Sequence, residues 1–131
     1  MATAKLNWNF DRYLEKVDRT IADIDGAADR AALAGAKVAE SGMKRRVAVL
    51  TGELQDHIEI DGPRRDGNVH TVEIGVLRKK GASAEIARKA NAQEYGTSSM
   101  PAHPYARPTM IEDKAEINGA IKESLEKEGY L

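Results

Sequence analysis

The sequence predicts an α+β domain with a long N-terminal helical region, a small antiparallel β-sheet, a C-terminal helix and an extended proline-rich arm. Three patterns carry this prediction. From Phe10 to Gly42, apolar and small residues recur at steps that alternate between four and three, the spacing of one helix face. Residues 69–77 alternate between apolar and polar side chains, as in a half-buried strand. Ile117, Ile121 and Leu125 follow the i, i+4, i+8 spacing of an amphipathic helix.

Length and composition limit the function classes. The 131 residues suffice for one domain, 1–131, with a modest core, since 41% are hydrophobic but only 5% aromatic. A formal net charge of −1 gives no general attraction to nucleic acid or anionic membrane. Cysteine is absent, which excludes disulfides and thiolate metal sites. No stretch approaches the roughly 20 apolar residues of a membrane-spanning helix. We therefore expect no membrane partner.

Residues 1–50 form the predicted helical region. The large residues of the apolar face lie in its first half, and alanine and glycine lie in its second half, where a neighbouring backbone can approach closely. Asp25-Gly26 is a candidate break, but the face keeps its phase across it, which favours one helix. A helix from Phe10 to Arg46 would measure roughly 55 Å at 1.5 Å per residue, so part of it should project or pack on another subunit. The alternative is two helices forming a hairpin on one core.

Residues 51–81 are predicted to form a β-hairpin. Leu54 to Ile60 is the first strand, turn-forming residues 61–68 follow, and Val69 to Leu77 is the second strand. Two basic clusters result, one at the expected tip and one near the opposite end. Solvated loop charge explains them, and the functional alternative is contact with phosphates of DNA passing through a channel. The candidate DNA-channel residues are Arg64, Arg65, Arg78, Lys79 and Lys80.

Residues 82–108 are assigned to a loop and a docking arm. The alanine-rich stretch 82–93 is compatible with a short helix, and the sequence does not decide its state. Three of the chain's four prolines follow, and each restricts its own φ and that of the residue before it. Bulky side chains at Tyr95, Met100 and Tyr105 favour burial over disorder. The arm therefore either docks on another molecule or packs on its own domain.

Residues 109–131 form the predicted C-terminal helix, expected to cover one face of the sheet. Pro108 can occupy its first turn, and Gly129 ends it. Nothing in the sequence favours an enzyme, a cofactor or a metal site. His57, His70 and His103 lie in different elements without metal-ligand spacing. Ser98, Ser99 and His103 share a loop, but no strand–turn–helix elbow surrounds the serines.

One motif carries a family resemblance. Glu-aromatic-Gly-Thr, a short polar spacer and then Pro-Ala-x-Pro-aromatic-x-Arg-Pro resembles the head–tail connector, or tail-completion, proteins in the neck of long-tailed bacteriophages. Upstream, Thr51-Gly52-Glu53-Leu54 resembles that family's Thr-Gly-x-Leu element, and the order of elements also fits. The matching residues of the arm are Glu94, Tyr95, Gly96, Thr97, Pro101, Ala102, Pro104, Tyr105, Arg107 and Pro108.

The resemblance implies a structural virion protein, made in the bacterial host cytoplasm, that forms a ring between the tail tube and the head connector. A hexamer around the DNA channel is expected, with the head connector or adaptor and the tail tube or terminator as partners. The alternatives are a tail-terminator or tube-capping ring, or a small nucleic-acid-binding module. Tyrosine and arginine are favoured interface anchors, and Gly96 is expected to permit a backbone angle that larger residues resist. The predicted interface residues are Tyr95, Gly96, Met100, Pro101, Pro104, Tyr105, Arg107 and Pro108.

Overall fold

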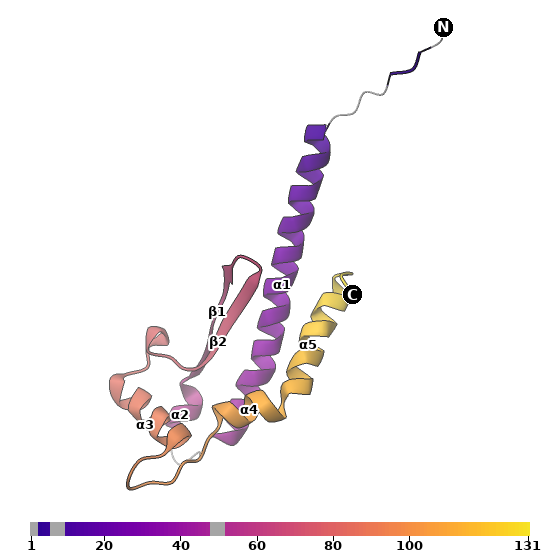
Figure 1. Cartoon of the computed structure of the whole chain (residues 1–131). Helices are drawn as coiled ribbons and strands as arrows, with labels where there is room; N and C mark the ends of the chain where they lie inside the picture. The colour runs from indigo at the N-terminus through magenta and orange to yellow at the C-terminus, as the bar shows by residue number, and fades with distance from the viewer. Residues whose placement is uncertain (1–2, 6–9, 48–51) are drawn as a thin grey trace.

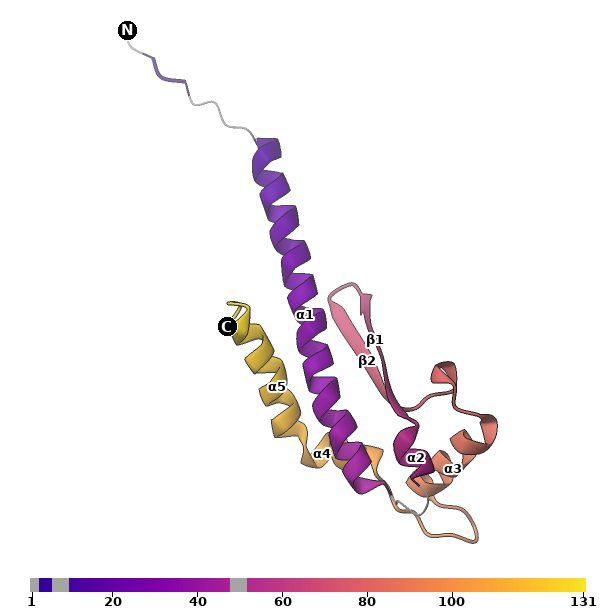
Figure 2. The same cartoon turned by 180° about the vertical axis from the view of Figure 1, so that it is seen from behind.

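One long helix organises the molecule. The computed structural model describes residues 3–5, 10–47 and 52–131. Helix α1 (Phe10–Arg46) runs through 37 residues without a break at Asp25-Gly26, which confirms the single-helix prediction. A β-hairpin lies along one side of α1, and the C-terminal helices lie along the other (Figures 1 and 2). The α+β architecture is therefore as the sequence predicts.

The two halves of α1 have different surroundings. The second half carries small buried side chains, with Ala31 at 2% and Ala39 at 1% exposure. The first half projects beyond the rest of the fold (Figure 1), and its large apolar side chains Leu14, Ile21 and Ile24 are 42%, 53% and 45% exposed. Small residues therefore mark the packed half of α1, and the large residues lie on the projecting half.

The hairpin pairs β1 (Ile58–Asp66) with β2 (Val69–Val76) in antiparallel fashion. The predicted turn over 61–68 is wrong in extent, because β1 continues past Asp61. A register shift between Asp61 and Arg64 accommodates the intervening Gly62-Pro63, as a bulge can within a strand. The tip is the pair Gly67-Asn68, between the paired Asp66 and Val69.

The predicted start of the first strand is also wrong. Helix α2 (Glu53–Asp56) precedes β1, and it begins after Gly52, whose φ of 76° lies in the left-handed region. The Gln55 side chain donates a hydrogen bond to the Lys44 carbonyl at 3.0 Å, which ties this turn to the end of α1. The helical turn lets Leu54 pack on the core cluster that contains Ile58. The 3₁₀ turn η1 (Arg78–Lys80) follows β2.

Much of the predicted loop at 82–108 is helical. Helix α3 (Ala84–Tyr95) starts at Ser83, whose hydroxyl accepts a hydrogen bond from the Ile86 N–H at 3.2 Å. A serine N-cap of this kind supplies a partner for an otherwise unpaired donor. The irregular arm is therefore confined to the ten residues between α3 and the next helix.

The C-terminal region contains two helices, α4 (Ala106–Glu112) and α5 (Lys114–Lys127), where the sequence predicted one. They meet at Asp113, whose carboxylate forms an ion pair with Arg46 at 2.7 Å. The Arg46 side chain holds the pKa of Asp113 below its usual range, against the effect of burial. The expectation that this region covers the sheet is wrong, because α5 packs along α1 (Figure 2).

The main apolar cluster lies at the C-terminal end of α1. Met43, Val47, Ile58 and Tyr105 are its buried members, with exposures from 1% to 5%. Leu54, Ile74, Val76 and Ala106 pack against it from the surrounding elements. This cluster joins α1, the hairpin and the start of α4, so it fixes the base from which the arm emerges.

Gly42 permits the close approach of α4 and of the α4–α5 junction to α1. A Cβ there would overlap the Asp113 carboxylate and would lie 2.7 Å from Thr109 Cγ2. We expect Gly42→Ala to lower the free energy of unfolding by roughly 1–3 kcal/mol through overpacking. Chemical denaturation of the isolated chain measures this effect.

Gly119 provides the matched control for Gly42. It also lies in a helix, but a Cβ there would have no atom within 4 Å. Gly119→Ala should raise the free energy of unfolding by about 0.5–1 kcal/mol, because alanine loses less backbone entropy in a helix. Equal shifts in both variants would contradict the packing assigned to Gly42.

Candidate docking surface

The arm begins with a sharp change of direction at Gly96. Its φ of 77° lies in the left-handed region, and a Cβ at this position would come within 2.9 Å of the Ala102 backbone nitrogen. Both the backbone angle and the close contact disfavour a side chain. The special backbone conformation expected of Gly96 is therefore present.

Hydrogen bonds hold the arm in one conformation. The Thr97 N–H donates to the Met100 carbonyl at 2.8 Å, which closes a tight turn. The His103 N–H donates to the Gln93 carbonyl at 2.7 Å, which ties the second half of the arm to the end of α3. The arm is a braced loop at the end of the molecule opposite the N-terminal end of α1 (Figure 1).

Glu94 joins the two ends of the arm. Its carboxylate accepts hydrogen bonds from the backbone N–H groups of Tyr105 at 2.8 Å, Ala106 at 2.9 Å and Arg107 at 2.9 Å. These donors belong to the N-terminus of α4, where the first N–H groups of a helix lack intrahelical acceptors. The next residue is Pro108, which has no N–H. One side chain therefore satisfies every donor at this helix end.

The electrostatics of this cap favour the charged carboxylate. Burial of Glu94 alone would raise its pKa, but the three backbone donors outweigh that effect and hold the pKa below its ordinary value. The positive end of the α4 dipole acts in the same direction. The Glu-aromatic-Gly-Thr and Pro-aromatic-x-Arg-Pro elements are thus two parts of one hydrogen-bonded unit.

The two tyrosines of the motif have opposite environments. Tyr95 is 68% exposed, and the Arg107 guanidinium lies over its ring at 5.5 Å from the ring centroid. Tyr105 is 5% exposed and belongs to the core cluster, where burial raises its pKa to about 12. The subunit's own core therefore takes up the Tyr105 side chain, and its placement does not support the predicted interface role.

The remaining predicted interface residues leave a small exposed surface, which we call the arm surface. Met100 is 40% exposed, and Pro101, Pro104 and Arg107 are also exposed. Gly96 and Pro108 are only partly exposed, and they shape the backbone. The arm surface thus consists of Tyr95, Met100, Pro101, Pro104 and Arg107.

The basic residues of the hairpin are largely engaged within the subunit. Arg65 donates to the Asp29 carboxylate of α1 at 2.8 Å, and Lys79 pairs with Asp61 and Glu73, both at 2.9 Å. Arg64 also pairs with Asp61. No ion pair links Arg78 or Lys80 to any residue within the described ranges. Three of the five candidate DNA-channel residues are therefore already neutralised by carboxylates.

His70 extends the cluster at the hairpin. Its Nδ1 lies 2.6 Å from Asp29 Oδ1, and its Nε2 lies 3.5 Å from Asp25 Oδ1. Bonds from Arg65 and His70 lower the pKa of Asp29. These contacts fasten the hairpin tip to the middle of α1.

Among the residues that the structure describes, no helix combines the length and apolar character needed to cross a membrane.

Sequence reasoning did not find the role of Glu94. Its hydrogen-bond partners lie 11 to 13 positions later in the chain, so neither helical nor strand periodicity relates them to it. The glutamate's place within the Glu-aromatic-Gly-Thr motif was the available signal.

Thr51, of the upstream Thr-Gly-x-Leu element, lies outside the described residues.

The fold and the surface together define a class of protein. It is a small α+β subunit whose exposed large apolar side chains include those of a braced arm and of a projecting helix, an arrangement suited to structural docking. Comparison with protein families gives a match to the HK97-gp10-like family, described as "Bacteriophage HK97-gp10, putative tail-component", over residues 9–96. The match covers about two thirds of the 131 residues, and the chain belongs to this family. No curated protein and no solved structure matches the sequence.

The extent of the family match also matters. It includes α1, the hairpin and α3, and it ends at Gly96, where the arm begins. The family membership therefore rests on the scaffold. The arm surface lies almost wholly beyond the match, so its role must be argued from its geometry.

Proposed function

We propose that this chain is a structural virion protein of a phage neck, which forms a ring that joins the tail tube to the head connector around the DNA channel. Membership in a family of phage tail components supports a non-enzymatic role within a virion. A hexamer is the expected ring. The head connector or adaptor and the tail tube or terminator are the expected partners.

The observation that carries the proposal is the combination of exposure and rigidity in the arm. Tyr95 and Met100 expose apolar surface at 68% and 40%, although both ends of the arm are held by hydrogen bonds to α3. A loop that is already ordered loses little conformational entropy when it binds. Tyrosine and arginine, which stack on each other here, are enriched among residues that dominate binding energy.

A closed ring sets a further requirement. A ring of more than two subunits needs a heterologous interface, in which each subunit presents one surface to one neighbour and a different surface to the other. The arm and the projecting half of α1 lie at opposite ends of the molecule (Figure 2), so they can serve different contacts. We assign the arm to the adjoining ring of the neck.

The role proposed for DNA is limited to non-specific contact. Because Arg64, Arg65 and Lys79 already pair with carboxylates, Arg78 and Lys80 are the remaining candidates for phosphate contact. Within the described residues, two unpaired cations in this basic region are few for a free nucleic-acid-binding module, whose affinity grows with the number of phosphates that it neutralises. A tail-terminator ring remains the second candidate, because the family description names a tail component. The position of the ring in particles distinguishes it from a neck ring.

The direct test of the arm is Tyr95→Ala in the phage that encodes this chain. We expect the variant subunit to fold, with a change in unfolding free energy of about 1 kcal/mol or less, because an exposed side chain and one cation–π contact are lost. We expect heads and tails to accumulate unjoined, with infectious titre reduced at least tenfold, since hot-spot residues contribute about 2 kcal/mol or more. Electron microscopy of the lysate measures joining.

Ser98→Ala is the matched control for Tyr95→Ala. Ser98 is exposed on the same arm and has no apolar surface to offer a partner. The Ser98→Ala variant should therefore leave the joining of heads to tails unchanged. Normal joining in Tyr95→Ala particles would remove the arm from the proposed docking contact.

A further inference from the structure

The projecting half of α1 carries apolar side chains that the rest of the subunit leaves exposed. We define the α1 stripe as Leu14, Val17, Ile21 and Ile24. Leu14, Ile21 and Ile24 are 42%, 53% and 45% exposed, and Val17 is partly exposed. Their steps of three and four give a repeat of about 3.5 residues, which is typical of helices that pack along another helix. An exposed apolar seam with this helix-packing spacing is a candidate interaction surface.

The α1 stripe continues a face that is already an interface within the subunit. At 3.6 residues per turn, the four side chains project within roughly 60° of the direction of Gly35. Gly35 faces α5, because a Cβ on it would lie 2.8 Å from Ile121 Cγ1. Helix α5 ends at Lys127, and Glu128 pairs with Arg30 of α1. The seam therefore runs on towards the N-terminus beyond the end of its intramolecular partner.

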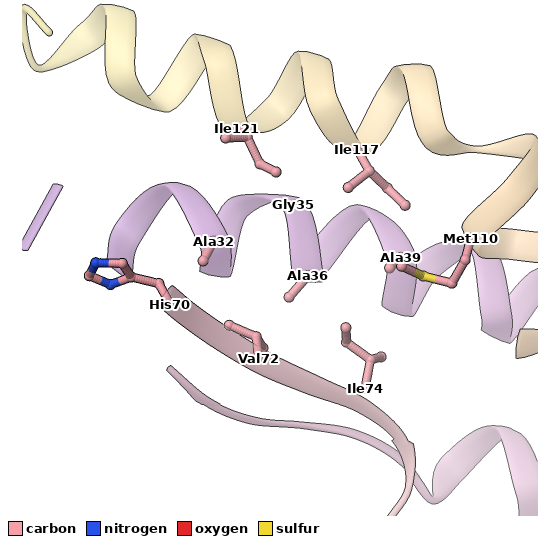
Figure 3. Close-up of a pocket in the computed structure, with 10 residues that line it drawn as sticks. All are labelled: Ala32, Gly35, Ala36, Ala39, His70, Val72, Ile74, Met110, Ile117 and Ile121. Atoms are coloured by element: carbon pink, nitrogen blue, oxygen red, sulfur yellow. The ribbon is translucent and has the colours of Figure 1, made fainter. Parts of the chain in front are cut away.

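A complementary groove lies further along the same helix. It is open, has a volume of about 180 Å³, and lies between α5 and β2 with α1 as its floor (Figure 3). Its floor is made of small residues, including Ala32, Ala36 and Ala39, and its walls include Val72, Ile117 and Ile121. His70 also lines the groove, and the other lining side chains are apolar, so the groove favours apolar groups.

We propose that the α1 stripe of one copy of this chain occupies the groove of a neighbouring copy. The stripe supplies large side chains, and the groove floor supplies small ones, so their shapes complement each other. A subunit cannot make this contact with itself, because stripe and groove lie on one continuous helix. Stripe and groove are different surfaces, so each copy can use both at once in a heterologous contact that repeats around a ring.

The size of the contact predicts weak pairwise association. The stripe spans 11 residues, or roughly 16 Å of helix about 10 Å wide, so its area is roughly 160 Å². This area is well below the roughly 800 Å² per partner of a standard stable interface. A single contact is therefore weak, and closure of a ring gives each subunit two. In a closed ring α1 must be inclined along the circumference so that its first half reaches the next subunit. The inference rests on the proposed function in one respect, namely that the ring in which the contact is used is the neck ring.

Cross-linking of the full-length chain tests which surfaces meet. Leu14 is replaced by the photoreactive residue p-benzoylphenylalanine, isotopically light and heavy chains are mixed, and the products are mapped by mass spectrometry. We expect mixed-isotope products that join residue 14 of one copy to groove segments 32–39, 70–74 or 110–121 of another. Products that join residue 14 to the stripe of another copy, or to other segments, would overturn the proposal.

Substitution on the stripe measures the strength of the contact. Ile21→Glu should weaken self-association at least about tenfold in light scattering across a concentration series, because a charge would enter an apolar groove. The control is Ala22→Glu, which adds the same charge at an exposed neighbouring position about 100° away around the helix. It should change self-association less than twofold. Equal effects in the two variants, or no self-association of the unmodified chain, would overturn the proposal.

The outcomes separate this inference from the proposed function. If Ile21→Glu particles contain a normal neck ring, the stripe contact is refuted and the neck assignment stands. If the expected cross-links form but the chain is absent from particles, the neck assignment is refuted and the contact stands. Circular dichroism of both variants confirms that helix content is retained before either comparison is made.

Discussion

Tyr105→Ala is expected to destabilise the isolated subunit by about 3–5 kcal/mol, the cost of removing a large aromatic side chain from a core. Tyr105 is 5% exposed and packs with Met43, Val47 and Ile58, so the substitution leaves a cavity where α1, β1 and α4 meet. A loss of this size is a large part of the stability of a small domain. Urea denaturation of the purified chain, followed by circular dichroism, measures it.

Two companion variants make this prediction specific. Tyr105→Phe keeps the ring and should cost less than about 1.5 kcal/mol. Tyr95→Ala, at the 68% exposed tyrosine of the same motif, should cost about 1 kcal/mol or less and should act on assembly instead. A folded, stable Tyr105→Ala subunit that fails only in assembly would show that this tyrosine belongs to the docking surface.

Glu94→Gln is expected to lower the free energy of unfolding by about 2–3 kcal/mol at neutral pH. Both carboxylate oxygens of Glu94 accept backbone N–H groups, and glutamine would present an NH₂ group to at least one of these donors. Hydrogen bonds to charged groups contribute about 1.5–3 kcal/mol, and an unpaired buried donor adds a penalty. The start of α4 and the closure of the arm should both weaken.

The pH dependence of this loss follows from the direction of the pKa shift. Burial opposes ionisation of Glu94, but the three backbone donors outweigh it, so its pKa in the folded chain lies below the ordinary value of 4.5. A carboxylate with a lowered pKa stabilises the fold fully above its unfolded pKa and loses this effect as the pH falls through the folded pKa. The difference between the wild-type chain and Glu94→Gln should therefore be largest near pH 7 and shrink below about pH 4.5.

Glu85→Gln is the control for the charge change. Glu85 lies on the same helix, its side chain is 71% exposed, and it approaches Lys89 at 3.6 Å. Its substitution should change the free energy of unfolding by less than about 0.5 kcal/mol. An effect of Glu94→Gln that is equally small, or that stays constant from neutral to acidic pH, would contradict the capping role.

The long helix could be predicted because local pattern determines it. The apolar face keeps one phase from Phe10 to Gly42, and no proline interrupts it. The change from large to small residues also indicated which half would receive a close neighbour, as the contact between Gly35 and Ile121 confirms. The C-terminal helix is predicted to cover the sheet, but α5 packs along α1 instead. An amphipathic stripe such as Ile117, Ile121 and Leu125 shows that a face is buried but not against which element.

The hairpin and the arm were predicted less well because distant contacts decide their details. Gly62-Pro63 is typical of a turn, but the pairing of Asp61 with Glu73 and Arg64 with Thr71 keeps both sides in the sheet. Likewise, the motif does not indicate that Tyr95 and Tyr105 have different environments. Only the folded chain shows that Tyr105 enters the core. Glu94 contributes to the placement of Tyr105, because its carboxylate accepts a hydrogen bond from the Tyr105 N–H.

The most direct measurement is a reconstruction of the assembled particle in which side chains of this chain are resolved at the head–tail junction. The account predicts that the arm keeps its braced conformation and that Tyr95 and Met100, which the subunit leaves exposed, are buried against an adjoining neck or tail protein. It would be contradicted by particles in which these side chains stay in contact with solvent, or in which the chain lies nowhere near the junction.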